Sequence, residues 1–344
     1  MLRRLALALG LLVVWAGLPS PASAQESAAP YTLGEGLPLG RSGVRLGGYA
    51  AVDVESPEHG TSTVTFDDLS LFVSAELGPH LRAFLEFEDA KFWTIEGGTS
   101  RVQHHGDLER LYVDYLRGDD LQVRIGKFLT PVGAWNEIHP DPLTWTVSRP
   151  LATYATFPTF VTGLMASGTQ PQESGSLDYA VFLQAGPCLD CATNARETER
   201  LVGGRLQWRA TRWEVGIPVL YFVDRLTREA VTLTGVHAGL RRGRLDLRGE
   251  ATVARVSGSL RSREYAAFGQ AMWALTDHLF LVGQAEQAAS ARSLDSWHAW
   301  TAGVLVRPVS GLSFKVDLQD RTGVFPVDEA GTGRRLLASV GVLF

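Results

Sequence analysis

The feature that most constrains the fold of this chain is a two-residue alternation of apolar and polar side chains. The run 243–253, GRLDLRGEATV, places glycine, leucine, alanine and valine at the odd positions and charged residues or threonine at the even ones. The runs 312–320 and 80–89 follow the same rule closely. Such alternation predicts β-strands that have one face in an apolar medium and the other in water.

Candidate strands of this kind recur along the whole chain, and the links between them alternate between short turns and long segments. An even number of strands of about 9–13 residues, with short links at one end and long links at the other, is typical of a transmembrane β-barrel. The sixteen candidates span approximately 43–55, 62–77, 80–90, 107–117, 120–129, 158–168, 176–185, 199–210, 213–223, 228–241, 243–254, 262–274, 277–288, 296–307, 310–320 and 334–344.

A soluble β-sandwich is the alternative that would also show alternating strands. A sandwich favours shorter strands and a polar exterior, and sixteen apolar faces would need a partner sheet throughout. In a barrel the apolar faces meet lipid and the sheet has no open edges. We therefore predict an all-β fold, an antiparallel transmembrane β-barrel of about 16 strands, with polar side chains inside and apolar ones outside.

The first residues have the pattern of an export signal. Arg3 and Arg4 precede the apolar run 5–18, and a small-residue segment ends at Ala24, which together predict a signal peptide over residues 1–24. The apolar run is too short to favour a membrane anchor, which was the other interpretation. The expected organisation is a short periplasmic segment at 25–42, then the barrel at 43–344, in the outer membrane of a bacterium. The barrel would end on Phe344, within its closing strand.

Charge and motifs narrow the function classes. The chain has 32 Lys and Arg against 37 Asp and Glu, so its formal net charge is −5, which argues against a nucleic-acid partner. Its eight histidines are scattered, and Gly-x-Ser-x-Gly, His-Glu-x-x-His and phosphate-loop motifs do not occur. We therefore expect neither an enzyme nor a cofactor. Cys188 and Cys191, in an exported chain, most simply form a small loop disulfide, although a redox or metal role is the alternative.

The stretch 124–151, RIGKFLTPVGAWNEIHPDPLTWTVSRPL, is the most distinctive in the chain. It resembles a strand and the following loop of the phosphate-selective porin O and P family and of related trimeric outer-membrane porins. The matching positions are Arg124, Gly126 to Phe128, Thr130, Pro131, Gly133, Trp135, Asn136, Asp141 to Leu143 and Ser148 to Pro150. The resemblance implies a water-filled barrel, a homotrimer, and a loop folded inward to narrow the pore.

Residues 130–157 are the best candidate for that inward loop and are called the constriction loop below. Four prolines would stiffen it. The alternative is an external loop that packs on a neighbouring subunit. Its charged or titratable members are Glu137, His139, Asp141 and Arg149.

The strand parity also predicts which charged side chains face the lumen. Lys127 is an exception, because its parity points to lipid, so we place it at the end of its strand or beyond a bulge, at the base of the loop. The residues we expect to line or narrow the pore are Arg124, Lys127, Glu137, His139, Asp141, Arg149, Arg110, Arg82, Arg244 and Arg248. The other predicted lumen bases are Arg45, Arg205, Arg209 and Lys315, and the predicted lumen acids are Asp53, Glu55, Asp68, Glu76, Glu86, Glu88, Asp114, Asp246, Glu250, Glu286 and Asp317.

These predicted lumen charges are nearly balanced. The phosphate-selective family is known for many arginines and lysines along the path, whereas this chain has only three lysines. Because a pore selects by the charges that line it, strong anion selectivity is not supported. The function predicted is passive diffusion of small hydrophilic or anionic solutes, with phosphate-like ions among the candidates. The alternative is a non-conducting structural or receptor barrel whose outer loops bind ligands.

Overall fold

The computed structural model describes residues 36–40, 42–151, 155–258, 262–291, 296–323 and 332–344. The predicted signal peptide lies outside these residues, as does most of the segment 25–42. In the part of the chain that is described, no helix is both long and apolar enough to span a bilayer.

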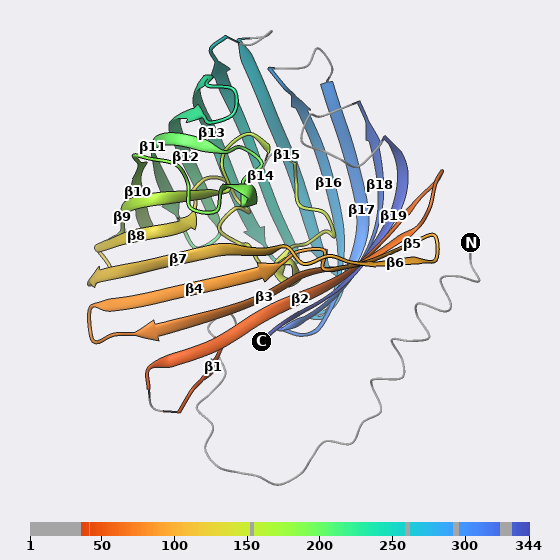
Figure 1. Cartoon of the computed structure of the whole chain (residues 1–344), viewed down its shortest axis with the longest axis horizontal. Coiled ribbons are helices and arrows are strands. Elements are labelled where there is room, and N and C mark those ends of the chain that lie inside the picture. Colours follow the sequence, from red (N-terminus) through yellow and green to blue (C-terminus); the bar gives the residue numbers. More distant parts are fainter. Residues whose placement is uncertain (1–35, 41, 152–154, 259–261, 292–295, 324–331) are drawn as a thin grey trace. The chain divides into compact units, whose positions relative to one another are not determined.

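Sixteen antiparallel strands form a closed barrel, as the alternation predicted (Figure 1). Each pairs with the next along the chain, and β19 closes the ring by pairing with β2, where Leu343 lies opposite Tyr49. The barrel strands are β2 (Val44–Pro57), β3 (Thr63–Glu76), β4 (Leu81–Asp89), β7 (Gly106–Arg117), β8 (Leu121–Leu129), β9 (Phe160–Gln172), β10 (Gly175–Gln184), β11 (Thr198–Arg209), β12 (Trp213–Asp224), β13 (Ala230–Arg242), β14 (Leu245–Val256), β15 (Arg263–Ala274), β16 (Leu279–Ala289), β17 (Ser296–Val309), β18 (Leu312–Thr322) and β19 (Gly333–Leu343).

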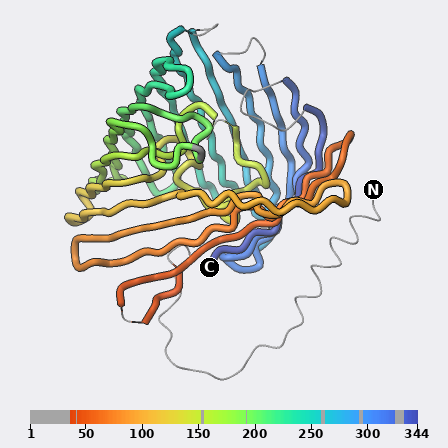
Figure 2. Tube along the Cα trace, in the orientation of Figure 1, coloured from red at the N-terminus to blue at the C-terminus, as the bar shows by residue number. Residues whose placement is uncertain are grey.

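Three short strands were not predicted. β1 (Leu37–Pro38) pairs with the start of β2, and β5 (Trp93–Glu96) and β6 (Thr99–Val102) form a hairpin in the link between β4 and β7. β5 also pairs with β3, so this hairpin extends the sheet beyond the barrel rim. The path of the chain around the ring can be followed in the tube of Figure 2.

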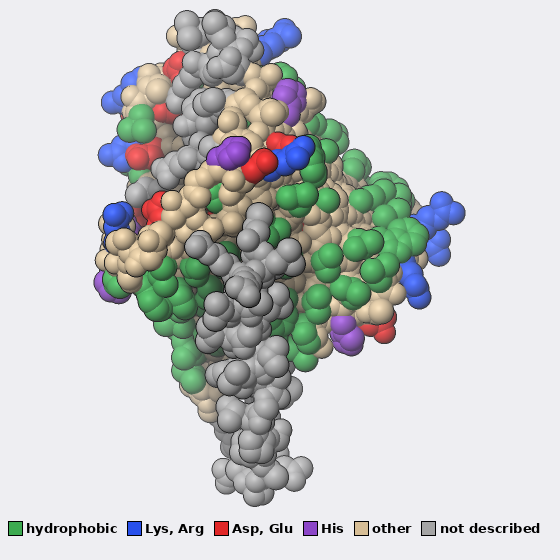
Figure 3. Space-filling view, turned by 90° about the vertical axis from the view of Figure 1, so that its right-hand side faces the viewer, with side chains coloured by type: hydrophobic (Ala, Val, Ile, Leu, Met, Phe, Trp, Pro, Cys, Tyr) green, Lys and Arg blue, Asp and Glu red, His purple; other side chains and the backbone are tan. Residues whose placement is uncertain are grey.

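Burial follows the alternation along most strands. In β18 the side chains of Val316 and Leu318 are 47% and 45% exposed, whereas Lys315, Asp317 and Gln319 between and beside them are buried. The exposed apolar face is therefore the outer one, and Figure 3 shows hydrophobic side chains over much of the visible wall. An apolar outer face of this kind is stable only against lipid, because no further sheet covers it.

The main chain of Phe344 completes this ring. Its N–H donates to the carbonyl oxygen of Gly48 at 2.8 Å, and its own carbonyl accepts from the N–H of Gly48 at 2.9 Å. The terminal residue thus extends the β19–β2 pairing beyond the end of β19, because its backbone groups are satisfied by the neighbouring strand.

The inner face is less polar than the sequence suggested. We expected water against the whole inner wall, but strands β10 to β14 carry buried apolar side chains there, among them Phe182, Phe222 and Leu233. They pack with Val132 and Phe157 of the constriction loop in one hydrophobic cluster. The two-residue alternation does not reveal this packing, because on these strands apolar side chains lie on both faces. The inward ones pack against the constriction loop.

Candidate functional site: a loop fastened inside the barrel

The constriction loop lies against the inner wall, far around the ring from the strands β8 and β9 that it connects. A 3-10 turn, η2 (Asp141–Leu143), is a regular element of the loop. Side chains of four distant strands accept its hydrogen bonds: Ala134 N to Glu250 Oε2 (3.0 Å), Trp135 Nε1 to Gln270 Oε1 (2.5 Å), Leu151 N to Glu286 Oε2 (2.6 Å) and Val147 N to Asp317 Oδ2 (2.7 Å). The loop is therefore inside the barrel and not an external contact loop.

Three of these acceptors are lumen acids that the strand parity predicted. Glu250, Glu286 and Asp317 each accept a backbone N–H of the loop, so their carboxylates serve to hold the loop. A charged acceptor makes a stronger hydrogen bond than a neutral one, which suits a loop with little regular structure of its own. These acids are consequently scaffold groups, and the charge that a passing solute meets must come from other residues.

Lys315 fastens the middle of the loop from β18. Its ammonium group, on a side chain that is 1% exposed, donates to the carbonyl oxygen of Asp141 (2.6 Å), the hydroxyl of Thr144 (2.6 Å) and the carbonyl oxygen of Thr146 (3.3 Å). Arg307 of β17 adds bonds from its guanidinium group to the carbonyl oxygens of Leu143 and Thr144. Two cations thus supply charged donors to buried carbonyl groups of the loop, where an unpaired polar group would be costly.

Two tryptophans of the loop hold Arg248 of β14. The rings of Trp135 and Trp145 meet edge to face with centroids 5.2 Å apart. The guanidinium carbon of Arg248 lies 4.4 Å from one ring centroid and 4.8 Å from the other. Cation–π contacts of this kind orient the guanidinium group without neutralising its charge.

A polar cluster joins the loop to the wall at β7. Arg149 donates to the carbonyl oxygen of His139 and, at 3.2 Å, to Oδ1 of Asp141. Nε2 of His139 lies 3.1 Å from Oε2 of Glu109 in β7. Burial, and the positive charge of Arg149, lower the pKa of His139 to about 3, so this imidazole is neutral at physiological pH.

The same region contains the one group of described residues with the composition of a metal site. Glu88, Glu109 and His139 are all buried, and their possible ligand atoms lie within 4.8 Å of one another. However, the hydroxyl of Tyr49 donates to Glu88, and NH1 of Arg149 lies 3.3 Å from Nδ1 of His139. A guanidinium group so close to the ring opposes a bound cation, so we interpret the group as a polar network.

Several inner-wall cations are paired with acids yet keep contact with solvent. Arg110 pairs with Glu86, and Arg124 makes two bonds to Asp114, at 2.7 and 2.9 Å. The side chains of Arg110 and Arg124 are 17% and 20% exposed, as is Arg149 at 20%. Exposed surface on inward-facing side chains means that water reaches them inside the barrel.

The structure brings some of the predicted site residues together and separates others. His139, Asp141 and Arg149 form one cluster within the loop. Glu137 reaches across to form an ion pair with Arg205 of β11. Away from the loop, Arg82 lies near the start of β4, beside the short turn, and Arg244, also exposed, lies in the short turn before β14.

Lys127 is held in the wall by the link between β10 and β11, residues 185–197, which we call the disulfide loop. Its side chain has no exposed surface, and its ammonium group donates to the carbonyl oxygens of Leu108 and Asp190 and to the hydroxyl of Thr193. Its neighbour Gly126 has φ +133°, a backbone conformation that favours glycine, while the pairing of β8 with β7 and β9 stays in register there. Because it is buried, Lys127 is not accessible to a solute in the pore.

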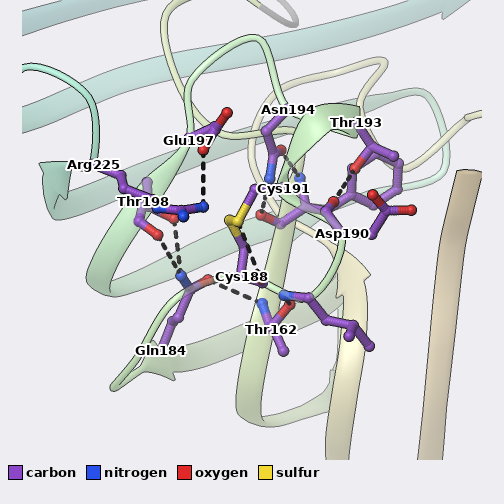
Figure 4. The surroundings of a disulfide bond; sticks show 12 residues. Thr162, Gln184, Cys188, Asp190, Cys191, Thr193, Asn194, Glu197, Thr198 and Arg225 are labelled. Atoms are coloured by element: carbon purple, nitrogen blue, oxygen red, sulfur yellow. Dashed lines mark hydrogen bonds and ion pairs between the residues drawn. A yellow bond between two sulfur atoms is a disulfide. The ribbon is translucent and has the colours of Figure 1, made fainter.

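Cys188 and Cys191 form a disulfide within the same loop (Figure 4). The loop is fastened to β9 from within the ring that the disulfide closes and from just after it. The N–H of Leu189 donates to the hydroxyl of Thr162 (2.9 Å), and Oδ1 of Asn194 accepts from the N–H of Phe160 (2.8 Å). The disulfide therefore stabilises the loop that buries Lys127.

Sequence reasoning missed two functional contributors. Glu109 was not assigned to the lumen because a register shift between β4 and β7, beside Glu86 and Phe87, breaks the parity on which the assignment depended. Arg307 was missed because it falls on the last position of the predicted strand 296–307. Arg307 shares its strand face with Thr301 and Leu305, which are both buried, and the polar Thr301 on that face was the signal that could have placed it inside.

The fold is that of the bacterial outer-membrane porins. No family model matches the sequence, and no curated protein matches it either. Solved structures do match over 88% of this chain.

Three of these solved structures illustrate the likeness. The anion-selective porin from Comamonas acidovorans has a TM-score of 0.62 at 12% identity, with 99% of its chain covered. OmpF of Salmonella typhi, in a complex with daunomycin, has a TM-score of 0.63 at 12% identity, with 97% covered. OmpT of Vibrio cholerae, in its trimer form, has a TM-score of 0.61 at 10% identity, with 99% covered. The likeness establishes the sixteen-stranded barrel, which the sequence had predicted.

Proposed function

We propose that this protein is a porin of the bacterial outer membrane, a water-filled channel for passive diffusion of small hydrophilic solutes. The observation that supports it most is the constriction loop, which is bonded to β14, β15, β16 and β18 from inside the barrel. The inward-facing arginines that stay partly exposed beside it indicate a hydrated path. A sixteen-stranded barrel is wide enough to leave an aqueous channel.

We also propose that anions, including phosphate-like ions, pass with at most a modest preference over cations. Arg110, Arg124 and Arg149 each have a carboxylate partner, which offsets their attraction for a passing anion. Arg248 differs, because its guanidinium group lies against the rings of Trp135 and Trp145, which do not neutralise its charge. The chain is proposed to act as a homotrimer, like the OmpT structure in its trimer form.

Planar-bilayer recording tests the channel and its lining together. Purified protein should give stable ohmic steps, and its reversal potential in a KCl gradient should lie near zero. Replacing Arg124 and Arg149 together by glutamine should shift that potential towards cation selectivity, because their acid partners remain. Arg101→Gln, on the exposed hairpin strand β6, is the matched control and should leave the potential unchanged.

The results separate the competing functions. Silence in the bilayer from folded protein would favour the receptor or structural barrel, in which the loops bind ligands and the lumen carries no current. Conductance without any shift in the double variant would keep the porin and remove Arg124 and Arg149 from its lining. Crosslinking in detergent, followed by mass measurement, checks the trimer independently.

A further inference from the structure

Two arginines face outward at the same level of the barrel wall. Arg255 of β14 and Arg263 of β15 are directly opposite each other in the strand register. Both are exposed, whereas their neighbours Ala254 and Glu264 are 1% and 2% exposed and point inward. The pair lies at the long-loop end of its strands, because the links before β14 and after β15 are the short turns.

Nothing in the described part of the protein neutralises this pair. Neither Arg255 nor Arg263 has an ion pair with any described residue, although the inward neighbour Glu264 pairs with Arg196. Like charges directly opposite each other in a sheet destabilise it. Charge at the edge of the hydrocarbon also carries a cost, although a smaller one than at the midplane. An anion outside the barrel would relieve both effects.

The outer wall below the arginines includes a patch of small residues. Directly next to the arginines, the outward positions are Val253 opposite Tyr265, both exposed. Beyond that pair, towards the short turns, the outward positions are small across three strands: Ala251 is opposite Ala267, Gly269 is opposite Ala285, and Gly283 is opposite Ala302. A Cβ built at Gly269 or Gly283 would meet no described atom within 4 Å. The side chain of Trp300, opposite Ala285 and 44% exposed, borders this floor.

The two features have the layout of an amphiphile's binding surface. About four residues, or roughly 13 Å of strand, separate the arginine pair from Ala251 and Ala267. Guanidinium groups bind phosphate oxygens in pairs of parallel hydrogen bonds, and two groups side by side suit a phosphate monoester. The floor of glycine and alanine offers a shallow, apolar channel along which acyl chains can pack.

We propose that this surface, formed by Arg255, Arg263 and the small-residue floor of β14 to β16, binds a phosphorylated lipid of the outer leaflet. The phosphate lies between the two guanidinium groups, and the acyl chains lie on the floor beside Trp300. The site is on the outside of the wall, so it is separate from the proposed pore. It would fix one lipid in a defined position on each barrel.

Native mass spectrometry of the full chain in neutral detergent tests the proposal. The probes are lipid A with two phosphates and the same lipid after enzymatic removal of its phosphates. We expect binding of the phosphorylated form only. The double variant R255Q/R263Q should bind about 30-fold more weakly, because each basic residue near an anionic headgroup contributes roughly fivefold. G283L, which fills the floor, should also weaken binding of the lipid.

The matched control is Arg200→Gln. Arg200 is exposed on β11 next to the outward-facing Val202, but it has no arginine opposite it, since its register partner is Val223. Equal loss in R200Q and in R255Q/R263Q would overturn the proposal, because it would indicate only general attraction to charge. Unchanged binding in the double variant would overturn it as well.

Two further measurements separate other occupants. The first is competition by inorganic phosphate at millimolar concentration. If phosphate displaces the lipid completely from the wild type, and if G283L binds the lipid as tightly as the wild type does, the site recognises phosphate only and has no lipid surface. A change in oligomeric mass of R255Q/R263Q would show that a second copy of the chain covers the pair. Single-channel conductance should be the same in all these variants, since none of the residues faces the lumen, so a failed lipid site leaves the proposed pore function standing.

Discussion

Replacing Lys315 by methionine should release the constriction loop from the wall without unfolding the barrel. The substitution keeps the length of the side chain but removes the ammonium group that bonds to Asp141, Thr144 and Thr146 of the loop. The β18 backbone and its pairing with β17 and β19 do not depend on this group. The effect should therefore appear in the loop and not in the strands.

The contacts set the size of the effect. A hydrogen bond that involves a charged group contributes about 1.5–3 kcal/mol, and the two at 2.6 Å are the strongest of the three. The substitution also removes the free-energy cost of burying a charged ammonium group, and this offsets part of the loss. A net cost of about 3 kcal/mol remains, which raises the population of the released loop roughly 100-fold, since about 1.4 kcal/mol corresponds to a factor of ten.

Single-channel recording at constant voltage is the assay. The K315M channel should show larger current steps and frequent fluctuations, and proteases should cut within residues 130–157 faster than in the wild type. The control is Lys91→Met, which removes an exposed lysine in the link between β4 and β5 that makes no side-chain hydrogen bond to the described residues of the loop. Steady current of wild-type size from folded K315M, with the loop still resistant to protease, would refute the idea that Lys315 fastens the loop.

Three other perturbations test the site. The pKa of His139 is lowered to about 3 in the packed loop, whereas in a released loop this side chain would bind a proton at about pH 6.5. The packed position of the loop is therefore fully stable above about pH 6.5 and loses about 1.4 kcal/mol per pH unit below it. Channel noise should accordingly rise from pH 7 to pH 4.5 in the wild type and should not do so in H139Q. Removing the disulfide with C188S/C191S should destabilise the disulfide loop by about 2 kcal/mol, measured as faster local hydrogen exchange, because the bond closes only a short chain segment. Lys127→Met should lower the temperature of heat-induced unfolding of the barrel more than K91M does, since it removes the charged donor to the carbonyl oxygens of Leu108 and Asp190, and equal unfolding temperatures would contradict the anchoring role.

The strand positions could be predicted from the sequence because each strand carries its own signal. In β14, for example, polarity changes at almost every residue, and the predicted range 243–254 agrees with Leu245–Val256 within two residues. The hairpin of β5 and β6 carried no comparable pattern. β6 is exposed along its whole length and β5 is at most half-buried, so burial constrains the polarity of their side chains only weakly.

The site was predictable only in part. The constriction loop could be identified by its motif, and its inward path agrees with the expectation from the resemblance. The roles of its partners could not be predicted, because Glu250, Glu286 and Asp317 look like ordinary lumen acids until the loop is seen to donate to them. The position of Glu109 depends on a register shift that adds one residue to a strand, which parity cannot anticipate.

The sequence by itself determined that this chain forms strands with one apolar face, and therefore a barrel that meets lipid on its outside. That information is local, because alternate side chains of a strand lie on opposite faces whatever the rest of the fold does. Only the tertiary structure decided which strands the loop touches, which charges are left for a solute, and where Lys127 and the pair Arg255 and Arg263 lie. These depend on how the ring closes, which brings residues more than a hundred positions apart into contact.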